Sequence, residues 1–319
     1  MKVLLTGAAG FIGFHVSKAL LERGDEVVGI DNLNHYYDVR LKQARLEQLE
    51  KYERFDFRQV DICNITDELG DIDYDTIAHL AAQAGVRYSL ENPFEYIRSN
   101  VLGHTWMMEF ARRQQKLKHF VYASSSSVYG HNQKVPFSEG DRTDSPASLY
   151  AATKKADELI SHCYSTLYDI PMTGLRFFTV YGPWGRPDMA VWMFTKAIIE
   201  DRPIVLYNRG QMWRDFTYID DIVAGTIAAI DTPYAAHTVH NLGNNRPEMI
   251  GDLVAAIEAA VGKKATIGYE DMQAGDVERT YADTSSAGRL LGYHPKTLMM
   301  DGVAKFVEWY KEWSKNGKA

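Results

Sequence analysis

The chain has 319 residues, 45% of them hydrophobic and 24% charged, so it is long enough for a sizeable core and has the composition of an ordinary globular protein. Its formal net charge of −7 argues against a nucleic-acid partner, and no apolar stretch reaches the length of a membrane span. Its two cysteines, Cys63 and Cys163, allow at most one bridge and match no metal-ligand spacing, so we expect reduced thiols, no metal and a cytoplasmic location.

Six short apolar runs in the first 178 residues predict buried strands, with helical stretches between them. The predicted strands are Lys2–Thr6, Glu26–Ile30, Phe55–Val60, Thr76–Leu80, His119–Ala123 and Met172–Phe178. The clearest predicted helices are Gly13–Arg23, Pro93–Gln115 and Leu149–Tyr168. Strands that alternate with helices predict an α/β fold with a doubly wound parallel sheet covered on both faces.

The turn after the first predicted strand, "TGAAGFIG", places Gly7, Gly10 and Gly13 at the opening of the first helix. Glycine permits a tight turn and lets backbone N–H groups approach a pyrophosphate. The second strand leads to Asp31, where a carboxylate would bind the adenosine ribose hydroxyls and repel a 2′-phosphate. The neighbouring Asn32 supplies no compensating positive charge, so the pattern predicts NAD rather than NADP.

Four serines follow the fifth predicted strand in "SSSSVYG", from Ser124 to Gly130. They have three interpretations: a solvated turn, a serine nucleophile, or hydrogen-bond donors to a ligand. A nucleophile needs a G-x-S-x-G elbow and a histidine partner, and neither is evident. Because ligands of open α/β sheets bind at the carboxyl ends of the strands, we favour the donor cluster and keep the plain loop as the alternative.

The stretch "SLYAATKKADELI" places Tyr150 and Lys154 four residues apart on a predicted helix, so their side chains share one face. An unperturbed tyrosine phenol is a poor base at neutral pH. A lysine ammonium beside it, together with a positive nicotinamide, favours the phenolate, which can act as a general base. Together with the glycine turn and the serine run, the spacing predicts a catalytic pair.

After Tyr181 the pattern becomes irregular, beginning with the loop "GPWGRPDM". The elements expected there are a helix at Val191–Glu200, a strand at Ile204–Tyr207, a helix at Asp221–Ile230 and a strand at Thr238–Leu242. Because no low-complexity linker separates the halves, we expect a substrate-binding domain interleaved with the sheet. The expected division assigns residues 1–178 and about 214–243 to cofactor binding, and 179–213 and 244–319 to substrate binding.

Seven motifs resemble, in family order, the extended short-chain dehydrogenases/reductases that act on nucleotide sugars: "TGAAGFIG", "HLAAQAGVRYSLENP", "YASSSSVYG", "YAATKK", "RFFTVYGPWGRPDMA", "RDFTYIDDIV" and "GDVERTYAD". The resemblance covers almost the whole chain and is greatest to the UDP-glucuronate 4-epimerases. It implies a Rossmann-type sheet of about seven strands, with NAD tightly bound and recycled. It further implies inversion of C4 of UDP-glucuronic acid to give UDP-galacturonic acid, through a 4-keto intermediate with hydride return to the same sugar.

The resemblance implies a catalytic triad of Ser125, Tyr150 and Lys154, in which Ser125 bonds the 4-hydroxyl and relays its proton to Tyr150. Two of the implied cofactor residues have a second interpretation. Asp61 follows the third strand and either faces the adenine or caps a helix, and Asn100 either touches the cofactor or is a cap or core polar group. The implied cofactor residues are Gly7, Gly10, Phe11, Ile12, Gly13, Asp31, Asn32, Asp61, Ile62, Leu80, Ala81, Ala82, Gln83, Asn100, Tyr150 and Lys154.

The positions after Ser125 bear on the type of reaction. Related dehydratases resemble one another in having an Asp-Glu pair there, and related decarboxylases have a glutamate at the second position. Here they are Ser126 and Ser127, which cannot serve as acid and base near neutral pH, so elimination of water is disfavoured. Thr179, where UDP-galactose 4-epimerases have asparagine, completes a neutral, donor-rich pocket for a carboxylate. Arg186 either adds charge to that pocket or is a solvated loop residue.

Further substrate contacts are implied along the rest of the chain. Arg214 fits a diphosphate clamp, because arginine binds phosphate oxygens bidentately. The resemblance places Asp276 by the uridine ribose and Arg87 in the loop between cofactor and sugar. Arg279 either reaches the diphosphate or lies on the surface.

Three alternatives to this function stay open: a UDP-hexose or UDP-N-acetylhexosamine 4-epimerase, a UDP-glucuronate decarboxylase whose acid has moved, and a cofactor-binding regulator without chemistry. Such regulators usually lose the tyrosine or the lysine, and both are present here. In many relatives the helices that correspond to Pro93–Gln115 and Leu149–Tyr168 form a dimeric four-helix bundle. The resemblance therefore implies a homodimer that acts on a UDP-sugar.

Overall fold

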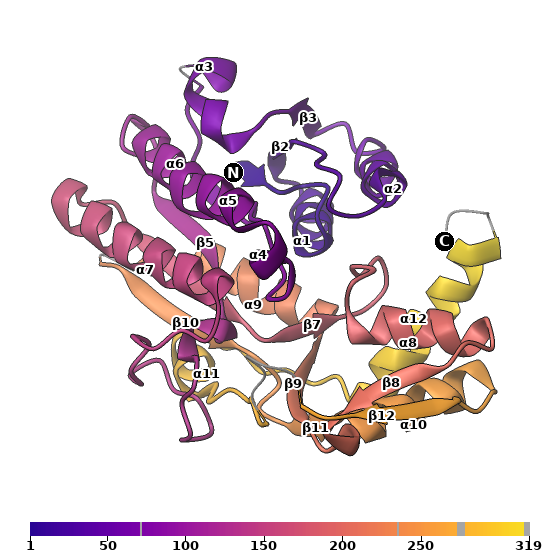
Figure 1. Cartoon of the computed structure of the whole chain (residues 1–319). Helices are drawn as coiled ribbons and strands as arrows, with labels where there is room; N and C mark the ends of the chain where they lie inside the picture. Colours follow the sequence, from indigo (N-terminus) through magenta and orange to yellow (C-terminus); the bar gives the residue numbers. More distant parts are fainter. Residues whose placement is uncertain (71, 235, 273–277, 316–319) are drawn as a thin grey trace.

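The computed structural model describes every residue except 71, 235, 273–277 and 316–319 (Figure 1). Its centre is a seven-stranded sheet in the order β10-β6-β5-β4-β1-β2-β3, in which every neighbouring pair is parallel. The prediction of an α/β fold built on a doubly wound parallel sheet is confirmed. The strands are β1 (Lys2–Thr6), β2 (Glu26–Asp31), β3 (Phe55–Gln59), β4 (Thr76–His79), β5 (His119–Ser125), β6 (Met172–Phe177) and β10 (Thr238–Leu242).

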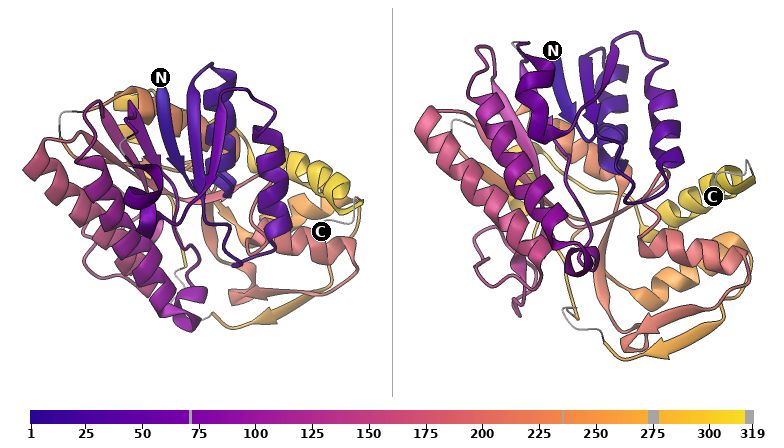
Figure 2. Two further views of the ribbon diagram at one scale, coloured as in Figure 1. Left: turned by 90° about the horizontal axis from the view of Figure 1, so that it is seen from above. Right: turned by 45° about the horizontal axis from the view of Figure 1, so that its top comes forward.

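Both faces of this sheet are covered by helices, which explains why its strands are apolar along their whole length. On β1, Val3 and Leu5 belong to the core of one face, whereas Leu4 belongs to the core of the other. Figure 2 shows the helices on the two sides. One face carries α1 (Phe11–Glu22), α2 (Val39–Leu49) and α9 (Ile219–Asp231), and the other carries α3 (Ile65–Leu69), α6 (Gly103–Ala111) and α7 (Leu149–Tyr168).

A second, smaller body continues directly from the carboxyl end of β6. It contains a three-stranded sheet in the order β11-β9-β7 and a two-stranded sheet of β12 and β8. Trp192 of the second body packs against Phe306, Trp309 and Tyr310 near the carboxyl end of the chain. Its elements are β7 (Thr179–Tyr181), α8 (Ala190–Ile199), β8 (Ile204–Tyr207), β9 (Trp213–Tyr218), β11 (Pro247–Met249), α10 (Ile250–Val261), β12 (Ile267–Glu270) and α12 (Met299–Lys315). The intervening α11 (Ser285–Leu291) packs against β10 of the central sheet and against α9.

The predicted single helix over Pro93–Gln115 is wrong in its regularity and in its end. The structure has α4 (Tyr88–Glu91), α5 (Pro93–Tyr96), a π-helical turn at Ile97–Leu102, and α6, which ends at Ala111. The wider turn directs Asn100 inward, where its amide bonds backbone atoms of the loop after β4. Three short 3₁₀ turns complete the fold, at Ile62–Asn64, Ser126–Tyr129 and Asn208–Gly210.

Helix α2 was not predicted, although it borders the cavity described below. Its buried face contains Leu41, Ala44, Leu46 and Leu49, but Lys42 and Arg45 are buried with them. Two cations on the buried face dilute the apolar periodicity from which a helix is predicted.

Candidate active site

Most of the sequence-predicted residues line one cavity at the carboxyl ends of the central strands, where the strand order reverses between β1 and β4. The structure thus brings together the glycine turn, the acid after β2, the serine run and the tyrosine–lysine pair. The predicted residues on its wall are Gly7, Gly10, Phe11, Ile12, Gly13, Asp31, Asn32, Asp61, Ile62, Leu80, Ala81, Ala82, Gln83, Ser125, Tyr150, Lys154 and Arg186.

The glycine turn is too crowded for side chains. Gly7 has a φ of +74°, and a Cβ there would lie 2.9 Å from the backbone nitrogen of Ala81. A Cβ on Gly13 would lie 2.0 Å from the carbonyl oxygen of Gly7. Helix α1 begins after Gly10 without a side-chain cap, so its first N–H groups and the positive end of its dipole are available to an anion. This cradle fits the pyrophosphate of a dinucleotide.

Asp31 ends β2 with its side chain almost completely buried. Its Oδ1 accepts a hydrogen bond from the backbone N–H of Leu33 at 2.8 Å and another from Nζ of Lys42 at 3.4 Å. Nζ of Lys42 also donates to Oδ1 of Asn34 at 3.0 Å. The acid predicted to bind the adenosine ribose therefore has a cation beside it, contrary to our expectation from Asn32 alone.

Asp61 caps a short turn, which is one of the two roles that the sequence left open, and its place beside an adenine stays a prediction. It lies on the wall of the cavity, and its Oδ1 also accepts from the backbone N–H of Cys63 at 3.0 Å, which caps the short turn after β3. Its other oxygen accepts from Asn32 at 3.3 Å and pairs with Arg98 at 3.0 Å.

Tyr150 and Lys154 lie near the start of α7, where the side chain of Ser148 caps the helix by accepting from the backbone N–H of Ala151. Both side chains reach the cavity. Nζ of Lys154 donates to the carbonyl oxygen of Ala123 at 2.9 Å and to Oδ2 of Asp157 at 3.0 Å. The ammonium is thus fixed between β5 and its own helix, one turn from the phenol.

The end of β5 is fixed by a buried ionic network. Ser124 donates to Oε1 of Glu158 at 2.7 Å, and the guanidinium of Arg176 bonds both oxygens of that carboxylate at 2.7 and 2.9 Å. Burial by itself raises the pKa of Glu158, but Arg176 outweighs it and keeps that pKa below its ordinary value. The network ties β5, β6 and α7 together immediately behind Ser125, whose Oγ accepts hydrogen bonds from the N–H and hydroxyl of Ser127 at 3.2 and 2.9 Å.

Arg186 reaches the cavity from the loop after β7. Its guanidinium is held by both oxygens of Asp188, and the hydroxyl of Tyr36 donates to the same carboxylate at 3.0 Å. Burial alone lowers the pKa of Arg186, but Asp188 outweighs it and raises that pKa, so the cation persists. Tyr36 lies in the loop after β2, so this contact joins loops from the two bodies over the cavity.

Ser126, Ser127 and Thr179 are half-buried and lie outside the wall of this cavity, although the two serines follow β5 directly and Thr179 opens β7. Asn100 is buried and also lies off the wall. Its Oδ1 accepts from the backbone N–H of Gln83 at 2.8 Å, and its Nδ2 donates to the carbonyl oxygen of Gln83 at 3.0 Å.

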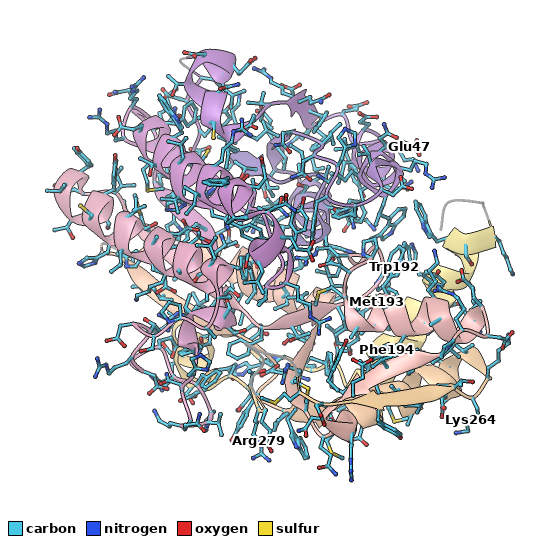
Figure 3. The ribbon with its side chains drawn as sticks, viewed as in Figure 1. Glu47, Trp192, Met193, Phe194, Lys264 and Arg279 are labelled. Atoms are coloured by element: carbon cyan, nitrogen blue, oxygen red, sulfur yellow. The ribbon has the colours of Figure 1, made fainter. Side chains whose placement is uncertain are left out.

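Arg87 and Arg214 line a second cavity, which lies between α8 and β8 and also includes Trp192, Met193 and Phe194 (Figure 3). The guanidinium of Arg87 lies 5.2 Å from the centre of the Tyr207 ring. Arg279 is exposed and stacks on Trp213 at 5.1 Å. Asp276 lies outside the residues that the structure describes.

Four residues near the first cavity were missed from the sequence. Asp157 and Asp188 follow Lys154 and Arg186 by three and two residues, so local spacing contained a signal for both pairs. Lys42 lies on the unpredicted helix and Tyr36 in the loop before it, and no pattern connected either to the cavity.

Other site classes find no support in the described part of the chain. Its histidines, cysteines and acids form no group of three or more that could hold a metal ion. None of its helices combines the length and the apolar character needed to cross a membrane. Cys63 and Cys163 are both unpaired.

Residues 4–306 match the family described as GDP-mannose 4,6 dehydratase. UDP-glucuronate 4-epimerase 4 of Arabidopsis thaliana is 49% identical over 328 residues, which cover 97% of this chain and 75% of that protein. Protein CapI of Staphylococcus aureus is 48% identical over 336 residues, covering 99% of this chain and 100% of that protein. The solved structure of UDP-glucuronic acid 4-epimerase from Bacillus cereus in complex with UDP-glucuronic acid and NAD is similar at a TM-score of 0.91 and 38% identity, covering 98% of this chain and 99% of that one.

Proposed function

Because the chain belongs to the GDP-mannose 4,6 dehydratase-like family of extended short-chain dehydrogenases/reductases, we propose that it is an isomerase that inverts C4 of UDP-glucuronic acid to give UDP-galacturonic acid, with NAD as its cofactor. The observation that carries this function is the meeting of Tyr150, Lys154 and Ser125 with the glycine turn at one cavity. The residues after Ser125 are hydroxyls rather than carboxylates, which favours epimerisation over the removal of water.

The three residues have different roles in the reaction at C4. The Tyr150 phenolate accepts the proton of the sugar's 4-hydroxyl, through Ser125, while the ammonium of Lys154 favours the phenolate. NAD, which the glycine turn and Asp31 would hold, would supply the acceptor for the hydride of C4 and the donor for its return. The 4-keto sugar turns over before the return, so that hydride reaches the opposite face and Tyr150 gives back its proton. Cofactor and enzyme would end as they began, so one bound NAD would serve repeated turnovers without a second substrate.

The sugar's carboxylate makes the 4-keto intermediate prone to decarboxylation. With a carboxylate on C5, the 4-ketone is a β-keto acid, which loses carbon dioxide when the bond to the carboxylate aligns with the carbonyl π system. Ser126, Ser127, Thr179 and Arg186 form the proposed carboxylate pocket. Its support is the position of the three hydroxyls at the end of β5 and the start of β7, together with a persistent cation on the cavity wall.

The test of this pocket is product analysis of Thr179→Ala and Arg186→Ala with UDP-glucuronate. Each hydrogen bond to a charged group is worth roughly 1.5–3 kcal/mol, enough to change a product ratio about tenfold or more. We expect slower epimerisation and leakage to a decarboxylated 4-keto-pentose. Wild-type binding with an unchanged product ratio in both variants would place the carboxylate elsewhere.

The second cavity is the proposed site for the UDP portion of the substrate. Its apolar wall suits a flat base, and Arg87 and Arg214 offer guanidinium groups to a diphosphate. Asp276 completes this proposal as the partner of the uridine ribose. With it we propose the division into residues 1–178 with about 214–243 for the cofactor, and 179–213 with 244–319 for the sugar nucleotide, where β9 opens the 214–243 segment although it pairs with β7 and β11 of the second body.

A homodimer and a cytoplasmic location complete the proposal. Helices α5 and α7 lie side by side on one face of the molecule (Figure 1). The side chains of Phe94, Leu159 and Leu167 on these helices are 84%, 59% and 65% exposed. Three such large apolar side chains are unusual on helices that face solvent. The same three side chains on a second copy of the chain would cover them in an isologous contact. The unpaired cysteines support a reducing compartment.

A further inference from the structure

A carboxylate and an ammonium are buried together where the first cavity borders the carboxyl end of β2. Asp31 and Lys42 both line the cavity, and their side chains are only 8% and 6% exposed. The ammonium lies 3.4 Å from Oδ1 of Asp31 and 3.0 Å from Oδ1 of Asn34. It also lies 5.4 Å from the centre of the Tyr37 ring. A buried ammonium is costly unless it is paired, and Asp31 supplies its one charged partner among the described residues.

The helix that carries Lys42 is anchored to the glycine turn. Three residues further along α2, the buried guanidinium of Arg45 donates to the carbonyl oxygen of Ala9 at 2.8 Å and to the hydroxyl of Tyr37 at 2.7 Å. Ala9 belongs to the glycine turn, so α2 is tied to the pyrophosphate cradle. The backbone from which Lys42 extends is therefore fixed relative to that cradle, and the ammonium itself is held by Asp31 and Asn34.

The pair has a consequence for the choice of cofactor. The two hydrogen bonds to Asp31 fall on Oδ1, and no described residue donates one to Oδ2, which leaves that oxygen for a ribose hydroxyl. A 2′-phosphate at the position of that hydroxyl would be repelled by the negative charge of the Asp31 carboxylate. If Asp31 were neutral, the same phosphate would meet an ammonium with no other charged partner.

We propose that Lys42 is a specificity-determining residue, and that Asp31 and Lys42 together form a latent 2′-phosphate site. The carboxylate accepts the ribose hydroxyls and at the same time occupies the cation that would otherwise bind the phosphate of NADP. The preference for NAD therefore depends on one charge. This inference rests on the proposed dinucleotide site, but it concerns binding and does not require turnover.

The test uses four variants of the full chain, stripped of cofactor: Asp31→Asn, Lys42→Met, the double variant and Arg40→Met. Asparagine preserves the shape of Asp31 and the acceptor for Leu33. Arg40 is the matched control, because it is a cation on the same helix, exposed and paired with Asp38. The probes are NAD, NADP, ADP and adenosine 2′,5′-bisphosphate, titrated by calorimetry, and UDP binding and the melting temperature verify folding.

Asp31→Asn is expected to bind NADP and the bisphosphate roughly 10- to 150-fold more tightly than the wild type, the range of one hydrogen bond to a charged group. The double variant should lose that gain, and Arg40→Met should match the wild type. Lys42→Met should weaken NAD without admitting NADP. Equal NADP affinity in Asp31→Asn and the double variant, or no gain in Asp31→Asn, would overturn the proposal. If Asp31→Asn fails to fold, Asp31→Ser takes its place with the same expected and contrary results.

The proposed function fails in a different way. A wild type that leaves UDP-glucuronate unchanged contradicts the epimerase but leaves the cofactor affinities interpretable, because the titrations contain no sugar. A wild type that binds neither dinucleotide contradicts the dinucleotide site and this inference with it.

Discussion

Among the described residues, each lysine or arginine on the wall of the first cavity forms an ion pair with one carboxylate. The three pairs are Lys42 with Asp31, Lys154 with Asp157, and Arg186 with Asp188. Burial, with the nearby charge of Lys154 added, lowers the pKa of His79 to about 3, so this neighbouring ring is neutral. The positive charges on the wall of this cavity are therefore fixed in place, and each can be tested by removing one side chain.

Replacing Tyr150 by phenylalanine removes the general base and keeps the ring. We expect NAD and UDP-sugar binding to persist while kcat falls by roughly two to four orders of magnitude, the usual contribution of a positioned base. Tyr164→Phe is the control, because it makes the same change on the same helix, where the hydroxyl bonds Glu109 instead of facing the cavity. Near-normal turnover by Tyr150→Phe would require another base.

Asp157 predicts a measurable dependence of stability on pH. Burial raises its pKa above the ordinary value, and Oδ1 of its carboxylate has no partner among the described residues. Between about pH 4, where an unfolded aspartate titrates, and the raised value, the folded state binds more protons than the unfolded state. The contribution of Asp157 to the free energy of unfolding is thus fully present below about pH 4 and is lost as the pH rises through that window.

The variant Asp157→Asn removes this titration. We expect the free energy of unfolding of the variant, minus that of the wild type, to increase from about pH 5 to about pH 7 in urea denaturation. Burial also raises the pKa of Asp215, to about 6, but that group is present in both proteins and cancels. A difference that is constant with pH would show that the Asp157 carboxyl titrates normally.

At the scale of elements, the cavity depends on how loops are attached to helices. The guanidinium of Arg45 is fully buried and joins α2 to both rims, through Ala9 in the glycine turn and the carbonyl oxygens of Trp184 and Gly185 at 2.6 and 3.3 Å. Because these acceptors would lose their donor together, Arg45→Met is expected to destabilise the protein by more than one ordinary buried hydrogen bond.

The expected loss for Arg45→Met is at least about 1–3 kcal/mol in urea denaturation, the penalty for one buried group left unpaired. Arg40→Met, an exposed change on the same helix, should stay within about 0.5 kcal/mol of the wild type. Equal stability of the two variants would mean that Arg45 does not connect the rims.

The sequence predicted those elements whose apolar pattern is regular. The central strands and α7 could be read from periodicity, and the positions of Gly7 and Tyr150 followed from the turn and the helix that hold them. Periodicity could not reveal α2, whose buried face includes two cations, or the π turn that directs Asn100 inward. Contacts across long sequence separations, such as Tyr36 with Asp188, have no local signal.

At the scale of the whole molecule, the exposed faces of α5 and α7 predict self-association. We expect Phe94→Lys combined with Leu159→Glu to convert a dimer into a folded monomer, measured by light scattering after size-exclusion chromatography. Charges placed in an apolar isologous contact enter it twice and lose their hydration. Tyr269→Lys is the control, since this side chain is 61% exposed on β12 in the second body. A wild type that is monomeric at micromolar concentration would contradict the dimer.

The central claim is that hydride leaves C4 of UDP-glucuronate and returns to the opposite face of the same carbon. Its most direct test is proton NMR of UDP-glucuronate deuterated at C4, incubated with the purified protein and no added cofactor. We expect UDP-galacturonate that retains its deuterium at C4, because the bound cofactor neither leaves the protein nor exchanges its hydride with solvent. Recovery of UDP-glucuronate alone, a decarboxylated product, or loss of deuterium from C4 would contradict it.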